Sequence, residues 1–417
     1  MLGSVDASLS KYRCTLAALA ALAATASFAQ SSVSISGTVD LGINQIDFKG
    51  NKVTTTGAAN GSATTAIVVA GTEDLGSGLK AEFRWEMDPD FGNTSNRTGG
   101  TAATGTTSNV TSSIGNGASF VGTSGAFGAV KFGTPNLATL TINGDGNGGF
   151  ATAIGSGYRV SSFDAVRWQN SVRYDTPEFN GFSGSFVYSA KNDLQRNTGS
   201  VGMTGNLNNQ TSGRDEGQEI GLNYVNGPLA VRYAGVRMKQ YASLVGFTGT
   251  ANGLYDNMAL LTPANLGAQF KIDSLSAKYA NALPGLNVSY FYQKVSSDVL
   301  SAVTAGGALG TQQFDRTTNG VAASYAITPA LTAMVNYQQV KNGDAAASTT
   351  GSKAGLTANV TGLGLDYALS KRTALYARYE RDADSAATFR SLANTGYTAA
   401  TGNTTYTATA VGVRHTF

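Results

Sequence analysis

The sequence predicts an all-β fold, a sixteen-stranded antiparallel transmembrane β-barrel with short turns at one end and long loops at the other. Three observations predict it. Apolar and polar residues alternate with a period of two over many short segments. Tight turns and long tracts rich in Gly, Ser, Thr and Asn separate these segments. The alternating segments carry charge on one face only, as expected where the other face meets lipid.

The composition excludes several other classes of protein. Charged residues make up 13% of the 417 residues, and no apolar run is long enough to cross a membrane as a helix. A hydrolytic triad would have to use the single histidine, His415, and one histidine is too few for most histidine-based metal sites. The net charge of +3 is too small to indicate nucleic-acid binding. We therefore expect a protein that is not an enzyme and that binds no cofactor, metal or nucleic acid.

Residues 1–29 have the features of a secretory leader. Lys11 and Arg13 precede an apolar run over 15–26, and Ser27-Phe28-Ala29 is a small-x-small cleavage site. The alternative, a buried core helix, fits these flanks poorly. We expect residues 30–417 to be the exported mature chain, which then has no thiol because Cys14 lies in the leader.

Five tight turns share one layout, in which a strand ends in tyrosine and the next strand begins with Leu or Phe. The tyrosines are Tyr174, Tyr224, Tyr279, Tyr325 and Tyr367, at spacings of 50, 55, 46 and 42 residues. Asn-Gly and Pro-Gly pairs at several of these turns are typical of β-hairpins. Tyrosines that recur at one end of the strands fit an aromatic girdle at a membrane interface.

Two earlier hairpins turn at 73–78 and 124–128, so the chain holds seven tight hairpins, or fourteen strands. A first strand over 33–43 and a last strand over 406–417 bring the expected number to sixteen. Eight longer connections then join the strands at the other end. They are 44–64, 88–117, 134–169, 190–217, 238–272, 295–318, 340–358 and 381–403.

A repeat of 40–50 residues is also typical of a β-propeller, and the distribution of charge decides between the two folds. In 79–87 one face is wholly apolar and the other carries Lys80, Glu82, Arg84 and Glu86. A misplaced Arg or Lys at mid-depth in lipid costs roughly 2–4 kcal/mol, which would keep one face free of charge. Inner strands of a propeller blade bury both faces instead. The residues expected to face the lumen include Lys80, Glu82, Arg84, Lys131, Arg173, Asp175, Arg232, Lys278 and Arg378.

Four segments carry a resemblance to a known family. They read SVSISGTVD at 32–40, GTEDLGSGLKA at 71–81, NSVRYDTPEF at 170–179 and VGVRHTF at 411–417. Along nearly the whole mature chain, the sequence resembles the trimeric general porins of the Gram-negative outer membrane, especially the β-proteobacterial branch.

The resemblance implies a homotrimer that is surrounded by the lipid and lipopolysaccharide of the outer membrane of a Gram-negative bacterium. Each barrel would pass ions and small hydrophilic solutes by passive diffusion. The third loop, about 134–169, would fold into the lumen and narrow it. The barrel-assembly machinery would read the terminal Phe417.

Two departures from the family pattern bear on ion preference. Where the family usually has Gly-Arg-Gln after its fourth strand, this chain reads Gly133-Thr134-Pro135, and an arginine often found before the Gly-Thr-Glu-Asp turn is absent from 65–70. Two basic residues that commonly shape the constriction are therefore missing. The anion preference frequent in this branch does not carry over on sequence grounds.

In a pore, fixed charges at the narrowest point set the ion preference. We expect wall cations to oppose acids of the third loop there, and the alternative for any one of them is a solvated wall residue or a structural ion pair. The candidates are Arg84, Lys131, Arg167 and Arg173 on the wall and Asp145 and Asp164 on the loop.

Two further features do not predict chemistry. Residues 144–149 match GxGxxG, but no helical period follows, as a dinucleotide site requires, and the downstream Glu of a calcium loop is missing. His415 alternates with the apolar residues of the last strand, so we expect it on the outer face.

The sequence leaves two alternatives to a general diffusion channel. They are a substrate-preferring channel and a surface adhesin or receptor that acts through its loops.

Overall fold

The computed structural model describes residues 32–48, 51–59, 61–89, 117–157, 167–168, 170–190, 214–240, 268–297, 300–303, 309–312, 315–342, 357–384 and 405–417. The predicted leader, residues 1–29, lies outside the described residues.

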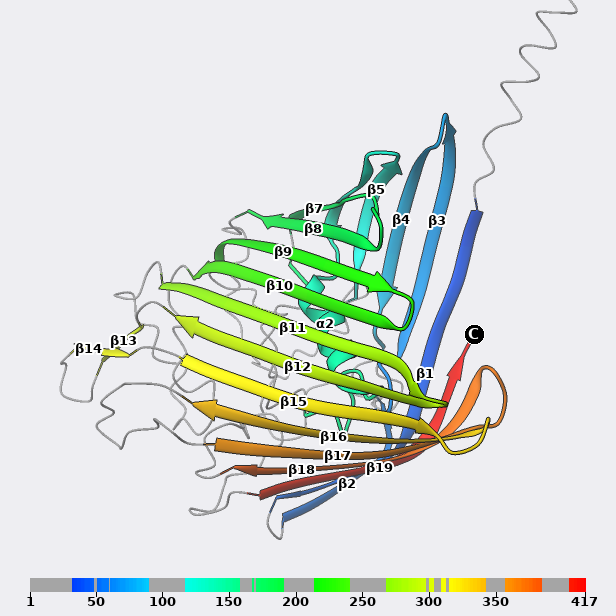
Figure 1. Cartoon of the computed structure of the whole chain (residues 1–417), viewed down its shortest axis with the longest axis vertical. Coiled ribbons are helices and arrows are strands. Elements are labelled where there is room, and N and C mark those ends of the chain that lie inside the picture. Colours follow the sequence, from blue (N-terminus) through cyan, green and yellow to red (C-terminus); the bar gives the residue numbers. More distant parts are fainter. Residues whose placement is uncertain are drawn as a thin grey trace, which may run out of the picture.

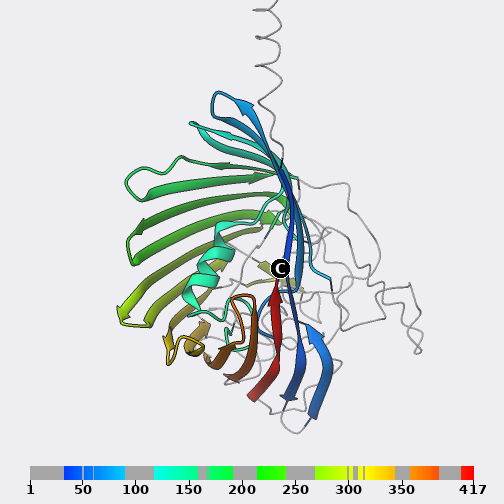
Figure 2. The same ribbon diagram turned by 90° about the vertical axis from the view of Figure 1, so that its right-hand side faces the viewer.

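Within these residues, sixteen antiparallel strands form a closed ring in which each strand pairs with the next (Figures 1 and 2). The last strand pairs with the first from Thr38↔Thr416 to Phe48↔Tyr406, so the sheet closes on itself. Closure satisfies the backbone hydrogen bonds that an open edge would leave exposed in lipid. The strands are β1 (Ser32–Phe48), β3 (Ala66–Gly76), β4 (Leu79–Met87), β5 (Ser119–Gly125), β6 (Gly128–Thr134), β7 (Ser171–Asp175), β8 (Phe182–Ser189), β9 (Arg214–Asn226), β10 (Leu229–Gln240), β11 (Ala268–Leu283), β12 (Leu286–Ser297), β15 (Asp315–Ala326), β16 (Leu331–Asn342), β17 (Thr357–Ala368), β18 (Thr373–Asp384) and β19 (Thr405–Thr416).

The sixteen-stranded barrel and its seven tight turns are confirmed. Each predicted hairpin joins two paired strands, as Ser77 and Gly78 do between β3 and β4 and Gly227 and Pro228 do between β9 and β10. The Asn-Gly turn between β7 and β8 has positive φ at both residues, Asn180 and Gly181, as a type I′ hairpin turn requires.

The first long connection, expected over 44–64, is wrong in large part. The first strand continues to Phe48, and a further strand, β2 (Asn51–Ala59), pairs back onto it. These residues are rich in Thr, Asn and small side chains and lack an apolar face, so period-two alternation did not reveal them. A second short hairpin, β13 (Leu300–Val303) with β14 (Leu309–Gln312), lies in the connection expected over 295–318.

A short helix, α2 (Ala138–Gly146), lies within the connection expected over 134–169. Figure 2 shows it inside the ring of strands. Its sequence, ATLTINGDG, has no amphipathic period, which is why no helix was expected there.

The two faces of the wall differ as the alternation predicts. Large apolar side chains project outward, including Val121, Leu222 and Val321, which are 59%, 54% and 57% exposed. Three of the recurring tyrosines, at the turn ends of β11, β15 and β17, are also exposed, as an aromatic girdle predicts. His415 is exposed on the same face as Val411 and Val413.

Because one face of the wall meets lipid and the other meets water, a change of charge should have a different effect on each face. Val321→Arg places a charge in lipid near the middle of β15, at a cost of roughly 2–4 kcal/mol, and we expect most of the protein to fail insertion. Lys278→Glu keeps a charge on the wet inner face, beside Asp145, and the barrel should still insert. Folding into liposomes, followed by heat-modifiable electrophoretic migration, measures both. Equal tolerance of the two changes would contradict the assignment of the faces.

Candidate pore constriction

After β6 the chain turns into the barrel. The helix α2 contacts the inner faces of β9, β10, β11, β12 and β15, and the residues after it reach β15 to β18. The inward segment 135–157 therefore covers the inner wall from β9 to β18 and leaves the remaining wall facing the lumen.

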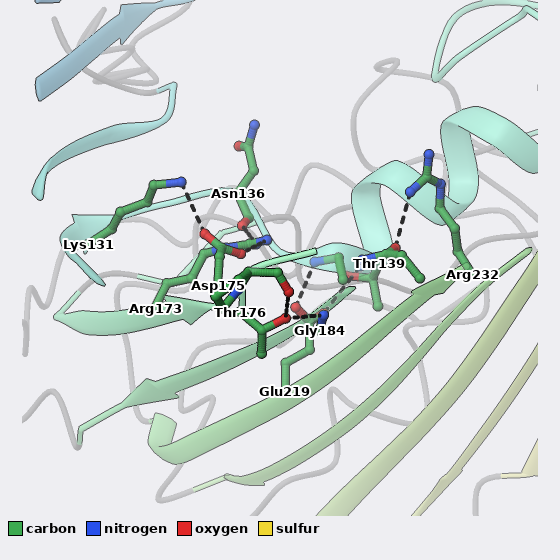
Figure 3. A network of polar contacts seen from close by, with 12 residues as sticks. Lys131, Asn136, Thr139, Arg173, Asp175, Thr176, Gly184, Glu219 and Arg232 are labelled. Carbon is green, nitrogen blue, oxygen red and sulfur yellow. Dashed lines mark hydrogen bonds and ion pairs between the residues drawn. The ribbon is translucent and has the colours of Figure 1, made fainter. Parts of the chain in front are cut away.

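The start of α2 is tied to the wall by a buried carboxylate. Glu219 of β9 is fully buried, and its Oε1 and Oε2 atoms accept hydrogen bonds from the backbone N–H groups of Ala138 (2.6 Å) and Thr139 (3.2 Å). Figure 3 shows its side chain pointing at this first turn. The N-cap residue Leu137 makes no side-chain cap. Glu219 thus supplies acceptors that the first turn of a helix lacks, at the positive end of its dipole.

The end of α2 is tied to the neighbouring strands. Arg232 of β10 donates from Nε to Asp145 Oδ2 at 2.6 Å, and Lys278 Nζ of β11 lies 3.9 Å from Asp145 Oδ1. An acidic residue near a helix C-terminus opposes the helix dipole, so these cations offset an unfavourable position as well as fix the helix end.

The segment after α2 is held by buried polar side chains of the wall. Glu380 of β18 accepts from the backbone N–H groups of Gly155 (2.8 Å) and Gly157 (3.1 Å). Asn336 of β16 donates to the carbonyl oxygens of Gly155 and Ser156 at 3.0 and 2.9 Å. Buried backbone polar groups outside regular structure need such partners.

Apolar packing completes the attachment of the inward segment. Ile142 of α2 packs in a buried cluster with Ala234 and Phe291 of the wall. Phe150 is fully buried. Gly146 lies so close to Phe291 that a Cβ there would come within 2.7 Å of the Cβ of Phe291. The side of the segment that faces the wall is therefore closely packed against it.

A first group of charges lies at the end of β4. Arg84 donates to Glu86 Oε2 from Nε (3.0 Å) and Nη2 (2.5 Å). Arg167 Nη2 reaches Glu86 Oε1 at 3.3 Å, and its Nη1 lies 3.8 Å from Asp88 Oδ2. Glu86 thus lies between two arginines.

A second group lies on β6 and β7 (Figure 3). Lys131 and Arg173, which are paired across the two strands, both reach Asp175, at 3.0 Å from Nζ and 2.7 Å from Nη2. Lys131 Nζ also lies 3.9 Å from Glu82 Oε1. Asn136 joins this group to the first: its Oδ1 accepts from Arg167 Nε and its carbonyl oxygen from Arg173 Nη1.

We call these two groups the wall charge cluster. It brings together all four cations that the sequence suggested, three of them on wall strands and Arg167 outside the strands, bridged to Asn136. Their acidic partners lie in β4, directly after it, or in β7, and not on the inward segment. Glu86 lies two residues from Arg84, and Asp175 two residues from Arg173, so the period of two could have revealed both pairs. Asp145 lies with Arg232 and Lys278 instead, and Asp164 lies outside the described residues. The cluster's acids are Glu82, Glu86, Asp88 and Asp175.

Asp88 follows the last residue of β4 and has an unusual acidity. The pKa of its carboxyl is raised to about 6, chiefly by burial. The charge of Arg167 lowers this pKa, the charge of Glu86 raises it and the charge of Arg84 lowers it. The wall charge cluster therefore changes charge near neutral pH.

This pKa predicts a pH-dependent ion preference. Between pH 7 and pH 5 Asp88 gains a proton, so the cluster becomes more positive by up to one charge and the reversal potential in a salt gradient should shift toward anions. Asp88→Asn should remove most of that shift. An equal shift in the parent and the variant would contradict the role of Asp88.

Within the described ranges, no group of three or more His, Cys, Asp and Glu residues is placed to hold a metal ion. Among the helical residues that the structure describes, none belongs to a helix long and apolar enough to cross a membrane. The charged side chains of this arrangement can act electrostatically on ions and solutes in the lumen.

Comparisons with known proteins give a consistent result. A family model described as Gram-negative porin matches residues 15–387. The major outer membrane protein P.IB of Neisseria gonorrhoeae is 28% identical over 312 residues, which are 73% of this chain and 76% of that protein. An outer membrane porin protein of Bordetella pertussis is 29% identical over 323 residues, 72% and 71% of the two chains.

Solved structures share the fold. An anion-selective porin from Comamonas acidovorans superposes with a TM-score of 0.65 at 23% identity, over 93% of this chain and 100% of that one. OmpT of Vibrio cholerae gives a TM-score of 0.60 at 14% identity, over 93% and 98%.

Proposed function

This chain belongs to the Gram-negative porin family and is an outer-membrane channel, and on this premise we propose how its pore selects what passes. Ions and small hydrophilic solutes diffuse passively between the inward segment 135–157 and the wall charge cluster, and the ion preference is weak. The observation that carries the proposal is the inward segment itself, tied to one side of the wall by buried carboxylates. The paired charges of the wall charge cluster line the opposite side of the lumen.

The exposure of the residues supports this path. Thr141 of α2 is exposed, whereas Ile142 and Asn143 beside it are buried against the wall. In the wall charge cluster, the side chains of Arg84 and Lys131 keep 36% and 22% of their surface exposed. Both sides of the path therefore present polar groups to water.

The charge count supports a weak preference. The cluster pairs four cations, Arg84, Lys131, Arg167 and Arg173, with the four acids named above. Opposite charges that close together produce a strong field beside that part of the wall but little net attraction for either ion. The solved porin from Comamonas acidovorans is described as anion-selective; the balanced cluster of this chain favours a preference closer to neutral.

We extend the proposal to assembly. OmpT of Vibrio cholerae has a trimer form among its solved structures, and we propose a homotrimer here, with its apolar outer face against the lipid and lipopolysaccharide of the outer membrane. Residues 1–29 would direct export. Phe417 ends the chain at the seam, where its backbone N–H and C=O pair with Gly37 at 3.0 and 3.1 Å, and we propose that the assembly machinery reads this residue.

Conductance of the purified protein in a planar bilayer under a KCl gradient tests the proposal. The parent should give large steps in multiples of three and a small reversal potential. Removing one acid with Glu86→Gln should move the preference toward anions and Arg84→Gln toward cations. The change should be at most about fivefold, because two unit charges 4 Å apart interact by about 1 kcal/mol in water. Folded protein without conductance would contradict the channel.

A further inference from the structure

On one side, β1 pairs with two different strands in succession, and the chain between those two strands does not pair with β1. Closure of the barrel does not require this interruption. Residues 41–48 of β1 pair with β2, and residues 32–38 pair with β3. Between these two partners the segment 61–65 leaves the sheet opposite Val39 and Asp40. Extra residues inserted into one strand of a pair bend the chain out of the ladder and re-aim its side chains.

The segment bends into the barrel, because lumen-facing side chains hold it. Asp40 is fully buried, and its Oδ2 accepts from the backbone N–H groups of Ser62 (2.7 Å) and Ala63 (2.6 Å). Arg414 of β19, on the face opposite the outward Val413, donates from Nη1 to Ser62 Oγ at 2.7 Å. Thr65 Oγ1 donates to the carbonyl oxygen of Asp40 at 3.0 Å.

A tyrosine of β18 contacts Asp40, the side chain that holds the segment 61–65. The hydroxyl of Tyr376, a residue only 5% exposed, donates to Asp40 Oδ1 at 2.6 Å. Its ring occupies space that three glycines leave open, because a Cβ at Gly42, Gly61 or Gly412 would collide with the hydroxyl oxygen. The three glycines therefore allow the ring to lie close to the backbone, and these contacts fix the position of the segment 61–65.

The same strand anchors both inward segments. Tyr376 and Glu380 lie on the inward face of β18, where Tyr376 supports the segment 61–65 through Asp40 and Glu380 holds Gly155 and Gly157 of the segment 135–157. Arg378 lies between them, with its guanidinium 5.5 Å from the Tyr376 ring centre and 5.7 Å from that of Phe150. Four residues of a strand span roughly 13 Å. The two anchors therefore follow one another along the strand, with that of the segment 61–65 nearer the tight-turn end.

We propose that the segment 61–65 is a second constriction element of the pore, on the tight-turn side of the segment 135–157, and that Asp40 is the positioning residue that holds it. The inference rests on the proposed channel function. Gly61, Ser62 and Thr65 are buried, whereas Thr64 is exposed, so Thr64 is the side chain that meets passing ions.

Charged thiol reagents test the position of Thr64. The only cysteine of the sequence is Cys14, in the predicted leader, so Thr64→Cys introduces the only thiol of the mature chain. Reaction with a methanethiosulfonate in a planar bilayer should cause a stepwise loss of current. A negative reagent should shift the reversal potential toward cations and a positive reagent toward anions. Thr123→Cys, on the exposed outer face of β5, is the matched control and should leave the current unchanged.

Two other outcomes would overturn the inference and leave the proposed channel function intact. If the parent conducts and mass spectrometry shows that the thiol of the Thr64→Cys variant is modified, but the current and the reversal potential stay the same, Thr64 does not line the pore. If that thiol reacts only in denatured protein, the segment is not exposed to the lumen. A parent that does not conduct contradicts the proposed function itself, and the inference falls with it.

The role of Asp40 is tested in the Thr64→Cys background. Asp40→Ala removes the acceptor of two N–H groups and one O–H group, so the open current should become noisier and the loss on modification smaller. Asp40→Asn keeps an acceptor and the shape and should restore most of both. Tyr376→Phe, which removes one hydroxyl, gives a milder variant if Asp40→Ala fails to fold. A folded Asp40→Ala or Tyr376→Phe barrel with the parent's noise and block would overturn the positioning role.

Discussion

The interior of this barrel depends on one interaction, a wall carboxylate that accepts two backbone N–H groups from a segment outside the sheet. Glu219 does this for the first turn of α2, Glu380 for Gly155 and Gly157, and Asp40 for Ser62 and Ala63. A peptide that leaves a β-ladder loses its hydrogen-bond partners, and burying them unpaired is costly. A carboxylate can accept several hydrogen bonds, so it satisfies two such donors from a single strand position. Glu219 uses both of its oxygens, whereas Oε2 of Glu380 and Oδ2 of Asp40 each accept both N–H groups.

The pore follows from where these carboxylates stand. Because Glu219 lies on β9 and Glu380 on β18, the segment 135–157 is spread over that half of the wall, and the charges of β4, β6 and β7 face the remaining water. The acids that hold the inward segments are buried and already bonded to backbone. The acids of the wall charge cluster are paired with cations instead, which leaves this cluster with a strong local field and little net charge.

The sequence predicted the parts of the fold that are local or periodic. Alternation assigned Lys131 and Arg378 to the inner face, and Asn180-Gly181 marked a hairpin, because strand geometry and turn conformation depend on neighbouring residues. The helix α2 was missed because its own sequence pattern does not predict it, and its contacts with the wall, such as that of Thr139 with Glu219, join residues 80 positions apart in the chain. Asp145 was assigned to the right loop, but its partners Arg232 and Lys278 depend on where the helix ends in space. The inward bend at 61–65 likewise depends on Asp40 and Tyr376, which no spacing connects.

The most direct test of this role for the wall carboxylates is the size of the largest neutral polyethylene glycol that enters the open pore, measured by its effect on single-channel conductance. The double variant Glu219→Ala and Glu380→Ala removes both anchors of the segment 135–157, and Glu178→Ala removes an exposed carboxylate beyond β7 as the control. We predict that the double variant, folded as a barrel, admits larger polymers than the parent and the control do. An unchanged size limit in the folded double variant would contradict the claim that wall carboxylates set the width of the pore.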